Sequence, residues 1–172
     1  MSTKFTSRHV FNIDAESFWT KIFFDKEYNE RMYRDVLKFK NFSILEQKDL
    51  GGGSISRRLL IEPSANVPGV LQKLIGDGFS YTEEGKYDAA TKRWTFRTIP
   101  SKLADKLTVK GEYYVEPKGE KQLERVISCE INCSIFGLGG TVEGFIEKQT
   151  RESYELVARF TNEFIAEKKL NG

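Results

Sequence analysis

The spacing of apolar residues changes from strand-like to helical at Phe136-Gly137-Leu138-Gly139-Gly140. Between about residues 38 and 135 apolar residues recur at every second position over short runs, and after this point they recur at every third or fourth. The later spacing predicts one long amphipathic helix over about 138–169, with an apolar stripe formed by Val142, Phe145, Ile146, Leu156, Val157, Phe160, Phe164 and Ile165. The polar residues Gln149 and Ser153 interrupt this stripe, which indicates a helix that covers a cavity rather than a solid core.

The N-terminal segment predicts one strand followed by two helices. Residues 4–13 alternate, with an inward-facing set formed by Phe5, Ser7, His9, Phe11 and Ile13. Asp14 is the expected N-cap of a short helix that buries Phe18, Trp19, Ile22 and Phe23. A second helix is expected from Asp25, with Tyr28, Met32 and Val36 or Leu37 on its docked face.

Six further strands are predicted between residues 38 and 135. They cover 39–49, 54–62, 79–87, 92–99, 107–116 and 122–135, and turn residues separate most of them. Connections this short join antiparallel neighbours, so one curved antiparallel sheet of about seven strands is expected in an α+β fold. One connection, at 66–76, should contain a short helix with Pro68 at its first position.

Composition and charge narrow the class of protein. The 172 residues fit a single domain over 1–172, and the formal net charge of +2 is spread along the chain, which argues against a nucleic-acid partner. Neither a membrane-spanning stretch nor a secretory leader is expected, and a cytoplasmic protein is the default interpretation. On one strand Cys129 and Cys133 lie too far apart for a disulfide and lack the geometry of a zinc site, so two buried free thiols are expected.

The order of these elements resembles the START-like (SRPBCC) superfamily, whose fold is the helix-grip fold. The resemblance includes the opening residues 10–19, VFNIDAESFW, together with residues 67–76, VPGVLQKLIG, and the FGLGG segment that leads through Glu143 and Glu147 into the last helix. The last two segments resemble an uncharacterised bacterial branch of the superfamily, a domain of unknown function. Residues 144–148, GFIEK, and 24–27, FDKE, are also similar to the sterol-transferring VASt (Aster) domains.

This resemblance implies an apolar cavity between sheet and helix that holds a lipid, a sterol or another hydrophobic small molecule. Non-catalytic binding, with transfer or sequestration of the ligand, is the preferred prediction, and no cofactor or metal is required. The superfamily also implies two alternatives. One is a cyclase- or hydratase-like enzyme that uses His9 and Glu83 as acid and base, and the other is a protein-binding module.

Strand alternation supplies the candidate cavity residues. His9 faces inward, either as a ligand contact or as a core histidine with satisfied hydrogen bonds. Arg57, Glu83 and Arg125 are also placed inward, where they form internal ion pairs or bind the acidic head group of a ligand, unless a shift of register exposes them to solvent. The full predicted set is His9, Phe11, Arg57, Tyr81, Glu83, Trp94, Phe96, Tyr113, Cys129, Phe145, Gln149 and Ser153.

The apolar residues of the connection at 66–76 have two interpretations. They either pack against the long helix or form a gate, with Val70, Leu71, Leu74 and Ile75 as its apolar face and Gly69 and Gly76 as hinges. In the second interpretation the gate admits the ligand and makes a transient contact with a membrane surface, beside Lys73.

Overall fold

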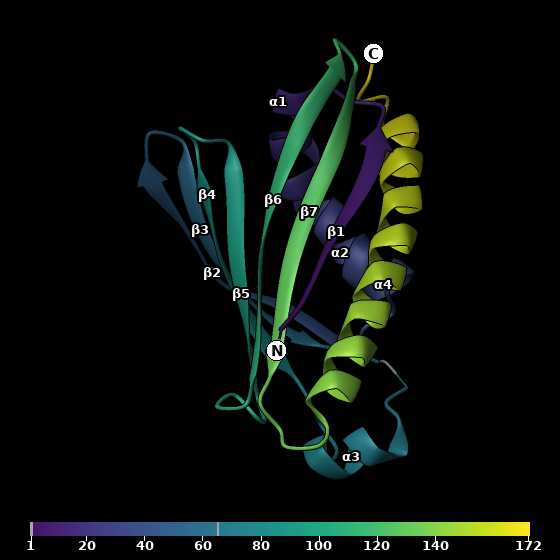
Figure 1. Ribbon diagram of the computed structural model, residues 1–172. Helices are drawn as coiled ribbons and strands as arrows, with labels where there is room; N and C mark the ends of the chain where they lie inside the picture. Colours follow the sequence, from purple (N-terminus) through teal and green to yellow (C-terminus); the bar gives the residue numbers. More distant parts are fainter. Residues whose placement is uncertain (1, 65) are drawn as a thin grey trace.

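A single antiparallel sheet dominates the computed structural model, which describes residues 2–64 and 66–172 (Figure 1). In this part of the chain the sheet has seven strands in the order β1-β7-β6-β5-β4-β3-β2. The strands are β1 (Ser2–Phe11), β2 (Asn41–Gly51), β3 (Ser54–Glu62), β4 (Tyr81–Asp88), β5 (Arg93–Pro100), β6 (Leu107–Gly119) and β7 (Gln122–Cys133). The predicted strands are confirmed in order and direction, with their ends displaced by at most three residues.

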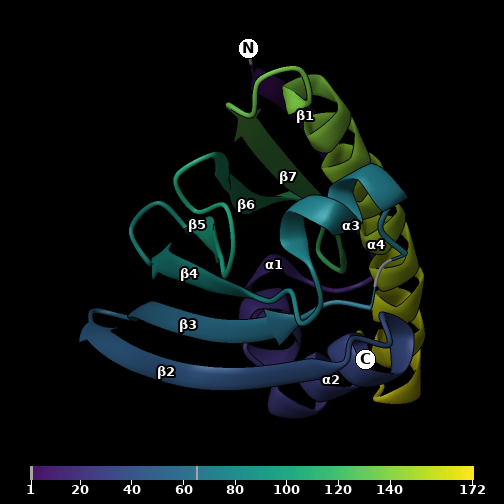
Figure 2. The same ribbon diagram turned by 90° about the horizontal axis from the view of Figure 1, so that it is seen from below.

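The sheet is curved, and the long helix α4 (Gly139–Glu167) lies across its concave side (Figure 2). Strand β1 pairs with β7, with Phe5 opposite Cys129 and His9 opposite Arg125. The five other pairings join strands that are consecutive in the sequence. The chain therefore forms a meander to which the first strand is added at one edge.

Two short helical segments follow β1 and line one end of the concave face. They are α1 (Ala15–Phe18), which continues into the π-helical turn η1 (Trp19–Phe23), and α2 (Lys26–Arg31), which continues into the π-helical turn η2 (Met32–Val36). Asp14 caps the first helix as predicted, since its Oδ1 accepts from the Ser17 amide at 2.8 Å. Asp25 caps the second helix in the same way, with its Oδ1 accepting from the Tyr28 amide at 2.7 Å.

Helix α4 is held to the sheet at its first turn. The buried Glu143 carboxylate accepts from the Thr3 hydroxyl and from the Cys133 amide, both at 2.8 Å. Gly139 permits the close approach, since a Cβ there would lie 2.5 Å from the Cys133 carbonyl oxygen. The predicted apolar stripe is correct except for Leu156, which is 44% exposed because it lies about 100° around the helix from the buried Val157.

The connection between β3 and β4 contains helix α3 (Gly69–Ile75), at the end of the sheet where α4 begins (Figure 1). Pro68 precedes this helix in an extended conformation, with ψ of 144°, and so forms its N-cap rather than its first residue as predicted. Its carbonyl still accepts from the Leu71 and Gln72 amides, each at 2.9 Å. Proline begins the helix in either case because the amide that it lacks has no partner in a first turn.

Two glycines inside strands make room for large aromatic side chains. A Cβ at Gly85 would lie 2.0 Å from Cζ2 of Trp94, and a Cβ at Gly111 would lie 2.8 Å from Cζ of Phe96. The indole of Trp94 and the phenyl ring of Phe96 therefore lie close over backbone that has no side chain of its own. This arrangement gives the concave face an aromatic lining while leaving space above it.

Candidate functional site

An internal cavity of about 330 Å³ lies between the concave face of the sheet, helix α4 and the short helices. Its lining is mainly apolar and aromatic, with contributions from η1, from α3 and from the inward positions of β3 to β7. Gln149, Thr150 and Ser153 of α4 also line it, so the polar interruption of the apolar stripe faces the cavity. A volume near the lower end of the roughly 300–1,000 Å³ of small-molecule sites suits a compact ligand.

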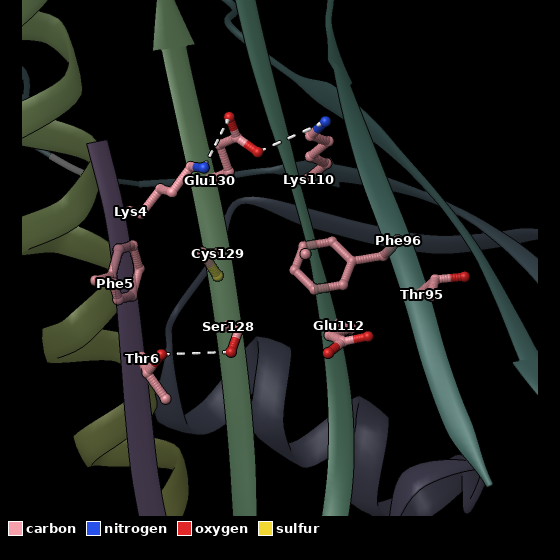
Figure 3. A pocket seen from close by; sticks show the side chains of 11 residues that line it. Lys4, Phe5, Thr6, Thr95, Phe96, Lys110, Glu112, Ser128, Cys129 and Glu130 are labelled. Carbon is pink, nitrogen blue, oxygen red and sulfur yellow. Dashed lines mark hydrogen bonds and ion pairs between the residues drawn. The ribbon is translucent and has the colours of Figure 1, made fainter. Parts of the chain in front are cut away.

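A second hollow of about 730 Å³ lies on the outer face of the sheet, across β1, β7, β6 and β5 (Figure 3). It is larger but broadly open to solvent, and much of its lining is polar or charged. The side chains there already pair with one another, as Glu130 does with Lys4 at 4.0 Å and with Lys110 at 3.6 Å. A ligand would remain mostly exposed on this surface, so we place the candidate site in the smaller internal cavity.

Most of the predicted residues lie on the wall of the internal cavity. The ten that do are Arg57, Tyr81, Glu83, Trp94, Phe96, Tyr113, Cys129, Phe145, Gln149 and Ser153. Leu71, Leu74 and Ile75 of the predicted gate line it as well. Their contact with a ligand stays a prediction.

The structure places three predicted residues elsewhere. Phe11 is fully buried in the core beside Phe18, with 6.0 Å between ring centroids, and does not reach the cavity. Val70 is 45% exposed on the outer side of α3. His9 lies between β1 and α4, and this position overturns the predicted acid and base pair of His9 and Glu83 across one cavity.

His9 is a structural connection between sheet and helix. Its Nε2 lies 2.8 Å from Glu155 Oε1, and its Nδ1 lies 3.1 Å from Nη2 of Arg125. Because a guanidinium group only donates, Nδ1 accepts and Nε2 carries the hydrogen that is donated to Glu155. This hydrogen bond lowers the pKa of the Glu155 carboxyl.

The buried Arg125, which is 3% exposed, is positioned by the same group of residues. Besides His9, its Nη2 donates to the Tyr154 carbonyl of α4 at 3.4 Å. Its guanidinium carbon lies 4.9 Å from the centroid of the Phe11 ring. Arg125 therefore closes one end of the cavity as a structural group whose charge is balanced through His9 and Glu155.

Arg57 is the second buried arginine, 5% exposed, and it lines the cavity from β3. Its Nη1 donates to the Phe23 carbonyl at 3.2 Å. Its guanidinium carbon lies 4.9 Å from the centroid of Phe23, 5.2 Å from that of Trp94 and 5.4 Å from that of Phe24. Three aromatic rings and one carbonyl thus fix the charged group in place.

Glu83 faces the cavity from the neighbouring strand β4. Burial raises the pKa of its carboxyl, and the nearby Arg57 offsets only part of this effect. Its negative charge in turn contributes to the raised pKa values of Tyr33, Tyr81, Tyr113 and Tyr154, for which burial is the larger cause. Glu83 is therefore an acidic group in a cavity whose wall also contains these four tyrosines.

Cys129 completes this polar group from β7. Its Sγ lies 3.5 Å from the Tyr154 hydroxyl, and burial raises the pKa of the thiol to about 11. Cys133 is also a buried free thiol. Cys129 is thus a neutral thiol at the cavity wall, without the thiolate character of a nucleophile.

The sequence did not reveal Tyr33 and Tyr154, which line the same cavity. The helical period through the second helix pointed to Met32, and the π-helical turn η2 brings Tyr33 inward beside it. Tyr154 directly follows Ser153, about 100° around the helix, and also lines the cavity, so the periodicity that singled out Ser153 did not indicate it. In the described residues, no helix combines the length and apolar character needed to cross a membrane.

A protein-family model, described as a protein of unknown function (DUF2505), matches residues 6–165 of the chain. The chain belongs to the DUF2505 family. No curated protein sequence matches it.

The fold of this chain is similar to the folds of several solved structures. The chain is similar to the Zhui aromatase/cyclase from Streptomyces sp. R1128, with 13% identity, a TM-score of 0.61 and 94% of each chain covered. It is similar to a START superfamily protein from Mycobacterium smegmatis, with 10% identity, a TM-score of 0.61, and 94% of this chain and 98% of that chain covered. It is also similar to norcoclaurine synthase from Thalictrum flavum in complex with dopamine and hydroxybenzaldehyde, with 16% identity, a TM-score of 0.62, and 95% and 88% covered.

At these identities the similarity shows the fold alone, and the predicted helix-grip fold of this DUF2505 chain is confirmed. The long C-terminal helix, the curved antiparallel sheet and the short helices after the first strand all have their expected places. The similarity to VASt domains stays a prediction.

Proposed function

We propose that this protein binds a compact hydrophobic small molecule non-covalently in the cavity between the sheet and α4. The observation that carries the proposal is the 330 Å³ cavity, whose apolar lining contains only a few polar groups. Burial of apolar ligand surface, at about 25 cal/mol per Å², would supply most of the affinity. The volume favours a ring system or a single short chain over a lipid with two acyl chains.

The comparison structures support this proposal at the level of the fold. Norcoclaurine synthase, in the structure named above, is in complex with dopamine and hydroxybenzaldehyde, which are small aromatic molecules. An aromatic-lined cavity of modest volume in the present chain fits molecules of that class.

Helix α3 is the proposed gate of this cavity. Leu71 and Leu74 pack on the core from α3. Among the described residues, the hydrogen bonds of the segment 68–77 join residues within that segment, with one exception. The exception is donated by Lys102 Nζ to the Asp77 carbonyl at 3.4 Å. Gly76 and Gly78 follow the helix with φ of 62° and 72°, a conformation that gives the segment a hinge. A segment held mainly by apolar contacts opens at a low cost in free energy.

The outer side of the gate is proposed to touch a membrane surface transiently. Val70 is 45% exposed on α3, and Phe136 is fully exposed on the connection that leads into α4 at the same end of the sheet (Figure 1). Replacing both by serine should slow ligand transfer from vesicles and leave exchange of dissolved ligand unchanged. Leu71→Ser should instead speed exchange of dissolved ligand, because Leu71 is buried. Equal effects of these variants on both assays would argue against the gate.

An enzyme of the cyclase or hydratase type is the second candidate, and one observation favours it. Glu83 is a carboxylic acid with a raised pKa inside an apolar cavity, which is how enzymes prepare a general acid near neutral pH. His9 takes no part in this version, because it lies outside the cavity.

The first experiment on the proposed function is mass spectrometry of an organic extract of the natively purified protein. A small hydrophobic molecule at about one per chain would support the binding function and identify its chemistry. No co-purified molecule, together with no thermal stabilisation by a panel of lipids, sterols and aromatic compounds, would count against it.

A further inference from the structure

Two opposite charges face the cavity without touching each other. Leu59 of β3 pairs with Glu83 of β4, and Arg57 pairs with Gly85, so Arg57 and Glu83 are diagonal neighbours on the concave side. Diagonal neighbours are roughly 7–8 Å apart at their backbones, within reach of two long side chains. Within the described part of the chain, however, no guanidinium nitrogen of Arg57 comes within the 4.0 Å of an ion pair with Glu83.

The position of Arg57 is fixed by other contacts. Its Nη1 is bound to the Phe23 carbonyl, and that oxygen also accepts from Asn29 Nδ2 at 2.9 Å. The rings of Phe23 and Trp94, which meet edge to face, lie 4.9 Å and 5.2 Å from the guanidinium carbon. Among the described residues its Nε and Nη2 have no hydrogen-bond partner, so part of the donor capacity of a buried cation is unused.

Glu83, whose side chain is only partly buried and lines the cavity, has no hydrogen-bond partner either among the described residues. None of the hydrogen bonds between described residues includes its carboxylate, although the charges of Arg57 and the surrounding tyrosines are close enough to affect its pKa or to be affected by it. A buried guanidinium and a carboxyl that faces an apolar cavity are each costly without hydrogen bonds, and the cost falls when one polar group bonds to both.

The charges of Arg57 and Glu83 determine which ligand head group can bind between them. A cationic head is disfavoured, because Arg57 already occupies the aromatic rings that would surround it. An anionic head would meet the Glu83 carboxylate, and an alkyl group would leave both charges unsatisfied. A hydroxyl group both accepts and donates, so it can bond to Arg57 and to Glu83 at once without adding a charge.

Building on the proposed binding function, we infer that the ligand is a hydrophobic alcohol or phenol. Its hydroxyl group accepts a hydrogen bond from Nη2 of Arg57 and donates one to the carboxylate of Glu83. Its apolar body lies between Trp94 and the polar turn of α4 that contains Gln149 and Ser153.

Four probes with one apolar skeleton test this assignment: naphthalene, 2-naphthol, 2-naphthoate and 2-naphthylmethylammonium, titrated into the full chain by calorimetry. We expect 2-naphthol to bind at least about tenfold more tightly than each of the other three, since two hydrogen bonds to charged groups distinguish it. In the double variant Arg57→Met/Glu83→Leu we expect the preference for 2-naphthol over naphthalene to disappear. Binding of naphthalene by this variant also shows that its cavity is formed.

The outcomes separate this inference from the function on which it rests. Equal affinity for naphthalene and 2-naphthol in the natural chain, or tightest binding of 2-naphthoate or of the ammonium, overturns the hydroxyl assignment while the binding function stands. A preference for 2-naphthol that survives in the double variant also overturns it. Absence of binding by all four probes counts against the binding function itself.

Discussion

The Nε2 atom of His9 donates to Oε1 of Glu155 at 2.8 Å, and this contact ties the centre of α4 to strand β1. Arg125 donates to the other ring nitrogen of His9 and to the Tyr154 carbonyl, so one histidine connects two strands and the helix. Within the group Arg125 lines the cavity, whereas His9 and Glu155 lie beside it. The contacts of His9 therefore hold the middle of α4 against β1 and β7.

Replacement of His9 tests this structural role. His9→Leu removes both hydrogen bonds and leaves Arg125 with one fewer partner, so we expect the free energy of unfolding to fall by about 1–3 kcal/mol. Affinity for a cavity ligand should change less than about threefold. Urea denaturation and ligand titration measure the two effects. Glu155→Gln is the matched control and should cost less, because Glu155 is largely exposed. Loss of binding with unchanged stability in His9→Leu would instead make His9 a ligand-binding residue.

Glu83 should make stability depend on pH. Its pKa is raised in the folded state, so the folded protein holds this proton more tightly than the unfolded chain does. The contribution of Glu83 is then fully present below the ordinary glutamate pKa of about 4.3 and is lost as the pH rises through the folded-state value. Relative to the natural chain, Glu83→Gln should gain stability between pH 4 and pH 7, measured by chemical denaturation at each pH.

Glu84→Gln is the control for this measurement, because Glu84 lies next in the same strand and pairs with Arg97 on the outer face at 2.9 Å. It should show no such gain. A stability difference between Glu83→Gln and the natural chain that stays constant across this pH range would mean that Glu83 titrates normally.

Cys129 should react slowly with alkylating reagents. Its thiol has a pKa of about 11, so only about one molecule in a thousand carries the thiolate at pH 8. Peptide mass spectrometry after iodoacetamide treatment should show slow labelling of Cys129 that accelerates with pH, and rapid labelling in guanidinium chloride. Bound ligand should slow it further, since Cys129 lines the cavity. Labelling of the folded protein as fast as that of the unfolded chain would contradict this assignment.

Gly85 should be necessary for the position of Trp94. Gly85→Ala places a methyl group where the indole lies, and a Cβ there would be 2.0 Å from its Cζ2 atom. We expect a loss of about 1–3 kcal/mol in stability, with a changed tryptophan fluorescence spectrum and weaker ligand binding. Gly144→Ala is the control, because it lies in α4 with nothing within 4 Å of its added methyl and should be neutral or stabilising. An unaffected Gly85→Ala would show that the ring can move freely.

The fold was predictable because its signals are local. Alternation in the strands, the cap at Asp14 and the long helical period each depend on neighbours in sequence. The polar residues Gln149 and Ser153 even indicated the cavity, since an uncompensated polar residue on a buried helix face needs a reason.

The site was only partly predictable, because its details depend on contacts between distant segments. Alternation predicted that His9 lies on the inner side of β1. It could not predict which turn of α4 lies opposite His9, and in the structure that turn contains Glu155. The separation of Arg57 from Glu83 depends on the Phe23 carbonyl, 34 residues earlier than Arg57. Tyr33 enters the cavity through a π-helical turn that helical periodicity does not indicate.

The central claim, a ligand-binding cavity under α4, is tested most directly by titration with the fluorescent apolar probe N-phenyl-1-naphthylamine in two matched variants. Ser153→Phe adds a ring on the cavity side of α4, and Glu152→Phe adds the same ring on its exposed side. We predict saturable binding of one probe per chain in the natural protein and in Glu152→Phe, and at least tenfold weaker binding in a folded Ser153→Phe. Equal binding by all three proteins, or no saturable binding by the natural chain, would contradict the claim.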